Sequence, residues 1–245
     1  MGIDRIATGH YARIEKDSQS GRFLLKKSVT DKKDQTYALY NMTQFQLERA
    51  LMPIGRYDKE TIRNMAKDMG FHVAQKPDSQ EICFIPDNNY GAFLQSNIKD
   101  PVKPGKFVDT KGNVLGEHKG IIYYTVGQRK GLGKSFGKPM YVVRLDVQNN
   151  VVVLGEAGEE FSSGLIASDL NWIAFDRVDK PMPVKAKVRY SAKESEAMVE
   201  PLDEGKARVI FEKPQRAITP GQSVVFYIDD VVVGGGVIEE QINHS

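Results

Sequence analysis

The N-terminal part of the chain alternates short apolar runs with segments of helical spacing. Residues 3–11 read as a short strand that runs into a glycine turn, and residues 22–26 read as a second strand. Residues 43–46 fit a capping box, which predicts that a helix begins there. A lone first strand makes no sheet, so we expect its partners elsewhere and expect the chain to begin in the middle of a domain.

A further helix is predicted after Asp58, which is placed to cap it, and Gly70 stands where a C-terminal cap belongs. Its apolar side chains recur at i, i+3, i+4 and i+7, and we expect this stripe to lie in a core: Ile62, Met65, Ala66 and Met69. A short strand over residues 71–74 and a short helix over residues 90–94 complete this part.

Helical spacing stops at Pro101, and turn-separated apolar runs follow to the end of the chain. Residues 106–116 and 140–154 read as hairpins, and residues 121–126 read as a strand. Six strand-like runs at short intervals then predict a small barrel: 170–173, 184–190, 197–199, 207–211, 223–227 and 231–238. The triple glycine 234–236 is expected to bend the last strand.

These patterns divide the chain into three parts. We predict an α/β part over residues 1–98, a central β-rich domain over residues 99–163 and a C-terminal β-barrel domain over residues 164–245.

Composition narrows the class of protein. With 40% apolar and 27% charged residues the chain is an ordinary globular protein, and no apolar run is long enough for a membrane span. A single cysteine cannot form an internal disulfide, which fits a reducing cytosol, so we expect a cytoplasmic location. We find no Cys/His cluster with zinc spacing and predict no metal site built from these side chains.

A net charge of +2 argues against a strongly basic nucleic-acid binder, but basic stretches occur at residues 26–33, 129–138 and 180–193. Each is either a solvated face or a track for a phosphate backbone. The second stretch belongs to a glycine-rich loop, Gly-Gln-Arg-Lys-Gly-Leu-Gly-Lys over residues 127–134. Its amides, with Arg129, Lys130 and Lys134, are able to hold polynucleotide phosphates, and a solvated hairpin loop is the alternative.

The only cysteine, Cys83, lies in Asp-Ser-Gln-Glu-Ile-Cys-Phe-Ile over residues 78–85. Polar residues precede Cys83 and apolar residues follow it. Two interpretations remain open, a buried cysteine that only packs or a reactive thiol. Near the N-terminus Gly9 would allow close approach of a backbone or ligand, and His10 is either a ligand-facing or a structural histidine.

The Cys83 segment resembles the second cysteine motif of the tRNA-specific 2-thiouridylases (MnmA/TrmU family). Four other stretches match the same family in the same order, up to Glu239: residues 6–11, 33–35, 127–133 and 219–223. The resemblance implies that residues 1–98 are a fragment of a nucleotide-binding PP-loop, Rossmann-like domain. The family's Ser-Gly-Gly-x-Asp-Ser loop and an earlier catalytic cysteine are not in this sequence. We therefore expect the chain to correspond to the C-terminal two thirds of such an enzyme.

The resemblance implies ATP-dependent sulfur transfer to the wobble uridine of tRNA, with Mg²⁺ accompanying ATP. ATP adenylates the uridine oxygen, and a cysteine persulfide, here assigned to Cys83, delivers sulfur. Gly9 matches an ATP-contacting position, and seven residues match tRNA-contacting positions: His10, Lys33, Asp34, Gln35, Arg189, Tyr190 and Gln222. The implied partners are tRNA and a sulfur-donor protein, either a cysteine desulfurase or a sulfur relay protein. The alternative is a tRNA-binding module without catalysis.

Overall fold

The computed structural model describes residues 2–30, 33–71, 90–98 and 101–243. The chain divides into two compact units. The first unit contains Met1–Lys76, Ser163–Pro214 and Pro220–Ser245, and the second contains Pro77–Ser162 and Gln215–Thr219. The predicted division into three domains, with boundaries after residues 98 and 163, stays a prediction.

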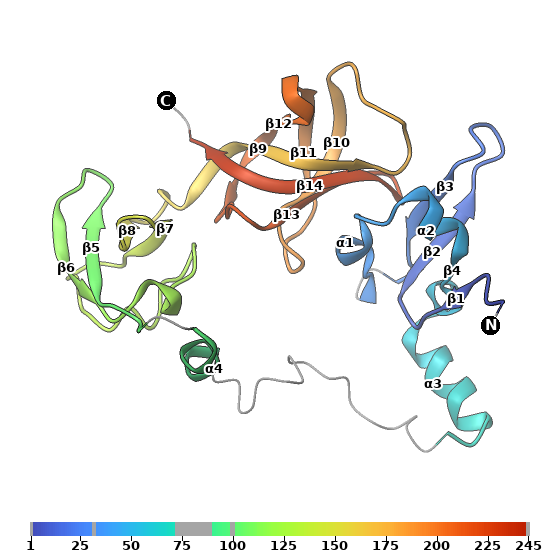
Figure 1. Cartoon of the computed structure of the whole chain (residues 1–245), viewed down its shortest axis with the longest axis horizontal. Helices are drawn as coiled ribbons and strands as arrows, with labels where there is room; N and C mark the ends of the chain where they lie inside the picture. Colours follow the sequence, from blue (N-terminus) through green and yellow to red (C-terminus); the bar gives the residue numbers. More distant parts are fainter. Residues whose placement is uncertain (1, 31–32, 72–89, 99–100, 244–245) are drawn as a thin grey trace. The chain divides into compact units, whose positions relative to one another are not determined.

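A closed barrel of six strands forms the larger part of the first unit (Figure 1). Around the barrel the order is β13-β10-β11-β12-β9-β14, and pairing of β13 with β14 closes it. The barrel predicted from the turn-separated runs is therefore confirmed. Its strands are β9 (Phe161–Trp172), β10 (Met182–Lys187), β11 (Ser195–Pro201), β12 (Ala207–Arg216), β13 (Ser223–Ile228) and β14 (Val231–Ile242), with a 3₁₀ turn η6 at Asp203–Gly205.

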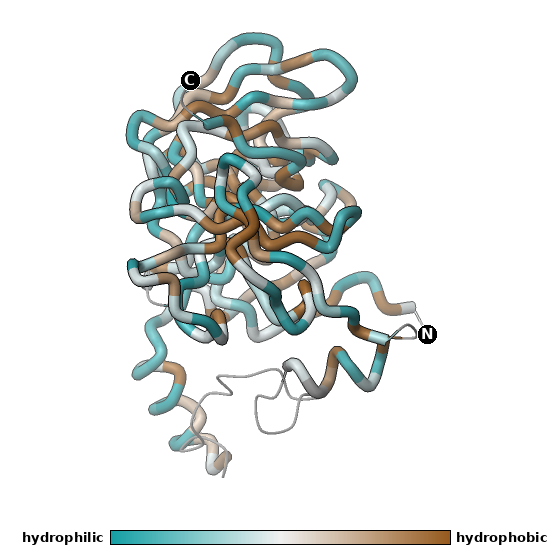
Figure 2. Tube along the Cα trace, turned by 90° about the vertical axis from the view of Figure 1, so that its left-hand side faces the viewer, coloured by the Kyte–Doolittle hydropathy of each residue, from teal (hydrophilic) through white to brown (hydrophobic). Residues whose placement is uncertain are grey.

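A hairpin from the N-terminal segment extends the barrel sheet. Strand β2 (Ala12–Lys16) pairs antiparallel with β3 (Phe23–Lys27), and β3 pairs antiparallel with the start of β14, so that Leu25 lies opposite Val232. Leu25, Tyr40 and Leu47 are buried in one cluster with the barrel residue Tyr227. The N-terminal segment and the barrel wall therefore share one hydrophobic core. Figure 2 shows the hydropathy along the chain, in which brown, hydrophobic runs are interrupted by teal, hydrophilic turns.

The rest of the N-terminal segment is small. Strand β1 (Ile6–Ala7) pairs in parallel with β4 (Ala50–Leu51), so the first strand has its partner within the chain. Between them lie the helices α1 (Thr36–Leu39) and α2 (Gln44–Arg49), and η2 (Pro53–Arg56) follows β4. The predicted capping box is confirmed, because the Thr43 hydroxyl accepts from the Gln46 N–H and the Gln46 side chain accepts from the Thr43 N–H.

Helix α3 (Lys59–Asp68) corrects one prediction. Asp58 caps it by accepting from the Thr61 N–H, and Gly70 follows with a φ of +76°, both as expected. The helix contains no buried residue, however, and Met65 and Met69 are 38% and 70% exposed. The stripe is therefore not buried in the structure described, because periodicity indicates which face is apolar but not what covers it.

The second unit contains helix α4 (Tyr90–Asn97) and a four-stranded sheet in the order β6-β5-β8-β7. Its strands, β5 (Gly105–Asp109), β6 (Val114–His118), β7 (Tyr141–Asp146) and β8 (Val151–Gly155), confirm both predicted hairpins. The predicted strand at 121–126 is wrong, because η5 (Ile121–Tyr123) forms a 3₁₀ turn after Gly120, whose φ is +141°. The short helix expected near residue 90 is confirmed, while the strand expected over residues 71–74 lies mostly outside the described residues.

Buried His118 is a fixed part of this second unit. Its Nδ1 accepts from the Gly120 N–H at 3.1 Å, so the other ring nitrogen, Nε2, carries the proton and donates to the Asn150 carbonyl at 3.2 Å. Burial lowers the pKa of His118, which keeps the imidazole neutral. In the part of the chain that the structure describes, no helix is long and apolar enough to cross a membrane.

Candidate functional site

Two segments about 150 residues apart in sequence meet on the first unit. The Tyr190 hydroxyl lies 3.5 Å from the Asp34 carbonyl oxygen, and the rings of Tyr190 and Tyr37 meet edge to face with centroids 6.2 Å apart. The Lys187 ammonium lies 5.8 Å from the Tyr37 centroid and 5.5 Å from the Tyr190 centroid. We call Tyr37, Lys187 and Tyr190 the tyrosine–lysine cluster. Tyr190 is 53% exposed, so the cluster presents an aromatic face and a cation to solvent.

Asp34 is held by its own chain. Its carboxylate accepts from the Ser28 N–H at 3.0 Å, from the Thr36 hydroxyl at 2.5 Å and from the Thr36 N–H at 3.3 Å. A carboxylate with these three donors shapes the turn before α1 and is not available as a free charge. The structure therefore gives the Asp34 side chain a positioning role and leaves its backbone carbonyl beside Tyr190.

Gln35 joins the N-terminal segment to this turn. Its backbone N–H donates to the Tyr11 carbonyl at 3.0 Å, and its side-chain oxygen accepts from the Tyr11 N–H at 2.9 Å. Next to Tyr11, partly exposed His10 places its Nδ1 2.9 Å from the Thr8 hydroxyl. Gln35 and His10 are thus brought together, and Lys33 is half-buried two residues before Gln35.

Gly9 is exposed, and a Cβ added there would meet only Ile54 Cδ1, at 3.9 Å. Nothing in the described residues therefore requires glycine at this position, and the close approach expected from the sequence would have to come from a ligand.

Gln222 is exposed at the turn that enters β13, and the Ile238 N–H donates to its carbonyl at 2.8 Å. The next residue binds the cluster directly: the Ser223 carbonyl accepts from the Tyr37 hydroxyl at 2.7 Å. Burial raises the pKa of Tyr37 to about 12, so its hydroxyl remains a donor at neutral pH. Arg189 is half-buried next to Tyr190.

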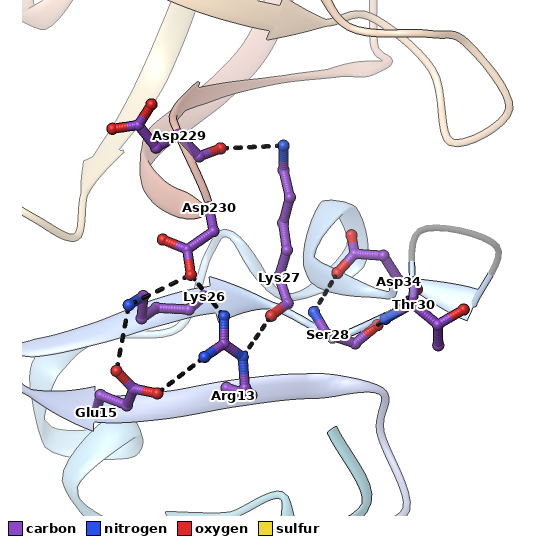
Figure 3. Close-up of polar contacts among 9 residues, drawn as sticks. All are labelled: Arg13, Glu15, Lys26, Lys27, Ser28, Thr30, Asp34, Asp229 and Asp230. Atoms are coloured by element: carbon purple, nitrogen blue, oxygen red, sulfur yellow. Dashed lines mark hydrogen bonds and ion pairs between the residues drawn. The ribbon is translucent and has the colours of Figure 1, made fainter. Parts of the chain in front are cut away.

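The hairpin that carries this surface is tied to the turn between β13 and β14 by an ion-pair network (Figure 3). Arg13 lies 2.5 Å and Lys26 3.3 Å from the Asp230 carboxylate, and both also pair with Glu15, at 3.1 and 3.2 Å. Burial would raise the pKa of Asp230, but hydrogen bonds from Arg13 and Lys26 outweigh it, so the net shift is downward. This network orients the strand that leads through Lys27 and Ser28 to Asp34.

Sequence reasoning missed Tyr37, Lys187 and the network. The only signal for Lys187 was its place in the basic stretch 180–193, and Arg13 and Asp230 are 217 residues apart.

Cys83 lies outside the described residues. The glycine-rich loop 127–134 belongs to the second unit. The described residues contain no group of His, Cys, Asp or Glu side chains that is able to hold a metal ion.

Three family profiles match the chain in succession. The profile described as the tRNA methyl transferase HUP domain matches residues 1–87, the tRNA methyl transferase PRC-barrel domain matches residues 91–156, and the aminomethyltransferase beta-barrel domain matches residues 162–238.

Curated relatives carry a more specific name. The chain is 64% identical over 239 residues to the tRNA-specific 2-thiouridylase MnmA of Acetivibrio thermocellus, covering 98% of this chain and 67% of the relative. It is 59% identical to MnmA 1 of Thermoanaerobacter sp. strain X514, with 97% and 65% covered, and 57% identical to MnmA of Clostridioides difficile, with 99% and 67% covered. The chain thus spans about two thirds of the length of these relatives. The identity is high and extends over nearly the whole chain, and the three family profiles match it one after another. The chain therefore belongs to the tRNA-specific 2-thiouridylase family.

Proposed function

We propose that this chain is part of an enzyme that forms 2-thiouridine at the wobble position of tRNA, and that the surface around the tyrosine–lysine cluster binds the tRNA. One observation carries the proposal: residues 33–35 and 189–190, which match the family's tRNA-contacting stretches, lie together on one surface. The names of the relatives, which specify 2-thiouridylase, support the reaction.

The chemistry of the surface suits an unpaired RNA loop. Proteins read RNA sequence mostly in single-stranded loops, whose bases stack on aromatic rings and hydrogen-bond through their edges. Exposed Tyr190 offers a ring, Lys187 offers a cation, and Gln222 offers a donor and an acceptor to a base edge. Arg189 is suited to a phosphate. His10, Lys33 and Gln35 extend the proposed contact surface.

Sulfur transfer is assigned to Cys83, which would carry sulfur as a persulfide received from a sulfur-donor protein. ATP, with Mg²⁺, supplies the adenylate that makes the uridine oxygen a leaving group, and exposed Gly9 offers its backbone to that nucleotide. The residues of this chain bind the tRNA and present the thiol. A cytoplasmic location is part of the proposal, since a reducing compartment keeps a single thiol such as that of Cys83 free of disulfides.

The alternative proposal is that a polypeptide of these 245 residues binds tRNA without thiolating it. It rests on two features of the family that this sequence does not contain, the Ser-Gly-Gly-x-Asp-Ser loop for ATP and the first catalytic cysteine, since Cys83 is its only cysteine. Incubation of the purified polypeptide with tRNA, ATP and a sulfide or persulfide donor, followed by nucleoside mass spectrometry, decides the point. We expect no thiouridine, and robust thiolation would reject this alternative.

Binding of tRNA tests the surface itself. Tyr190→Ala removes one stacking ring, which is worth about 1–3 kcal/mol and predicts affinity weaker by about 5- to 150-fold. Tyr57→Ala is the matched control, because Tyr57 is also exposed, at 41%, and makes none of the contacts of the cluster. Equal affinities of the two variants would remove the cluster from the proposed interface.

The assignment of Cys83 needs a separate experiment in a protein of the full length of the relatives. Cys83→Ser is expected to abolish thiolation and to leave the dissociation constant for tRNA nearly unchanged, because the change removes only the thiol. Thiolation at the wild-type rate would exclude Cys83 from the reaction.

A further inference from the structure

The segment Gly127–Met140 of the second unit, here called the basic loop, concentrates positive charge. It contains Arg129, Lys130, Lys134 and Lys138 and no acidic residue. Part of this charge is compensated: Lys138 forms an ion pair with Glu156. Arg129 and Lys130 are exposed, and the ion pairs of the described residues do not include them.

The frame of the basic loop is fixed by hydrogen bonds and by the core. Gln128 spans the turn, because its side-chain oxygen accepts from the Thr125 N–H and its side-chain nitrogen donates to the Lys130 carbonyl, both at 2.9 Å. Leu132 and Met140 are each 6% exposed and lie in the same hydrophobic cluster of the second unit. A loop held at these points has less conformational entropy to lose when a ligand binds.

Lys134 is also held in place. Its ammonium donates to the Leu115 carbonyl at 2.9 Å, and a Cβ at neighbouring Gly116 would lie 2.2 Å from that nitrogen. Glycine at position 116 therefore makes the room that Lys134 occupies. Gly131 and Gly133 have φ values of +75° and +74°, which sharply redirect the chain between the cations.

These residues line an open hollow of about 560 Å³, whose walls include Arg129, Gly131, Gly133, Lys134, Ser135 and Lys138. No carboxylate is among the residues that line it in the described part of the chain. Since Glu156 compensates Lys138, Arg129 and Lys134 are the cations that the hollow offers, beside a glycine-rich backbone, to an anion with several oxygens. A phosphodiester backbone matches this chemistry.

We propose that the basic loop is a second RNA-binding site of this protein, which binds backbone phosphates of the tRNA through Arg129 at the hollow and through the neighbouring exposed Lys130. This inference rests on the proposed function, since tRNA is the RNA that the protein would meet. Contacts to phosphates fix the position of the RNA and carry no sequence information, so the basic loop contributes affinity and register.

The test is the salt dependence of binding to a labelled tRNA between about 50 and 200 mM salt. Each phosphate contact contributes about 0.7–0.9 to the slope of log K against log salt, so Arg129→Ala with Lys130→Ala reduces the slope by about 1.4–1.8. The affinity difference from wild type then shrinks about 7- to 12-fold across that salt range. Lys111→Ala with Arg144→Ala is the control, because it removes one lysine and one arginine, both exposed, from the same unit outside the basic loop.

The outcomes separate the two proposals. If wild type binds no tRNA, the proposed function and the basic loop fail together. If wild type binds and the Arg129/Lys130 variant keeps its slope, or the control variant loses as much, the basic loop alone is rejected. A loss of affinity for tRNA but not for an unrelated RNA of equal length also rejects it, because phosphate contacts are not specific for sequence. A reduced slope on both RNAs, in the Arg129/Lys130 variant only, supports the proposal.

Discussion

The buried hydroxyl of Tyr37 allows a sharp test of how the candidate interface is held together. Tyr37 is 9% exposed, and its hydroxyl donates to the Ser223 carbonyl at 2.7 Å, which joins α1 to β13 beside Gln222. Tyr37→Phe removes the hydroxyl and keeps the ring. A hydrogen bond contributes about 0.5–1.5 kcal/mol net, and leaving a buried partner unsatisfied costs about 1–3 kcal/mol. We therefore expect the free energy of unfolding to fall by about 1–2 kcal/mol.

Tyr190→Phe is the matched control because it makes the same chemical change in the ring that contacts Tyr37. The Tyr190 hydroxyl is 3.5 Å from the Asp34 carbonyl, and the side chain is half exposed, so water replaces that contact. We expect a loss below about 0.5 kcal/mol. The edge-to-face contact of the two rings is retained in both variants, so the comparison isolates the hydroxyl.

Urea unfolding followed by Trp172 fluorescence measures the difference. Trp172 is the only tryptophan, and its ring stacks on Phe226 in the barrel with centroids 5.6 Å apart, so the signal reports the first unit. With a slope of about 2 kcal/mol per molar urea, Tyr37→Phe should lower the midpoint by about 0.5–1 M. Equal urea midpoints for the two variants would refute the reasoning. They would show that burial and hydrogen-bond distance do not determine how much each hydroxyl contributes to the free energy of unfolding.

Three further predictions test the contacts that stabilise the two units. Asp230→Asn should lower stability by about 0.5–1 kcal/mol at pH 7, as measured by urea midpoints across pH. The difference should shrink as pH falls below the unfolded-state pKa of about 3.9 and vanish below the lower folded-state pKa, where the carboxyl is protonated in both states. The second unit should lose stability as pH falls below about 6.5, because His118 binds a proton more readily in the unfolded than in the folded state. Amide exchange of the β5–β8 sheet measures this pH dependence, and His118→Gln should flatten it. Gly235→Ala should lower stability by about 1–3 kcal/mol in thermal melts followed by Trp172, because the added Cβ would lie 2.5 Å from the Tyr40 ring.

Local patterns in the sequence predicted the elements that local physics determines. The capping box at Thr43, the cap at Asp58 and the hairpin at 106–116 were found because the residues that form each of them lie within a few positions of one another. The apolar run at 121–126 was assigned to a strand, but Gly120 turns the chain and the run closes into a 3₁₀ turn. Alternation cannot distinguish a strand from a short turn whose side chains also reach the core.

The features that the sequence did not predict depend on contacts between residues that are far apart along the chain. The methionine stripe of α3 has the spacing of a core face, but burial depends on which element covers it, and that information is not contained in the helix. The same holds for Arg13 and Asp230, whose pairing depends on β3 lying beside β14. The family resemblance implied that residues 33–35 and 189–190 contact one tRNA, and the pairing of strands in the sheet explains how they become neighbours.

The geometry also separates two kinds of residue within the matched motifs. The Asp34 side chain accepts hydrogen bonds from Ser28 and Thr36, and the Gln35 side chain accepts one from Tyr11. These bonds fix the conformation of the turn beside Tyr190. Tyr190 keeps an exposed ring, and Lys187, which no motif contained, lies beside it. If the proposed RNA binding holds, a substitution at Asp34 should act through the shape of the surface, and a substitution at Tyr190 should act through loss of a direct contact. The pairing of β3 with β14 thus brings the residues of the proposed interface together, and we expect the matched residues to contribute to it unequally.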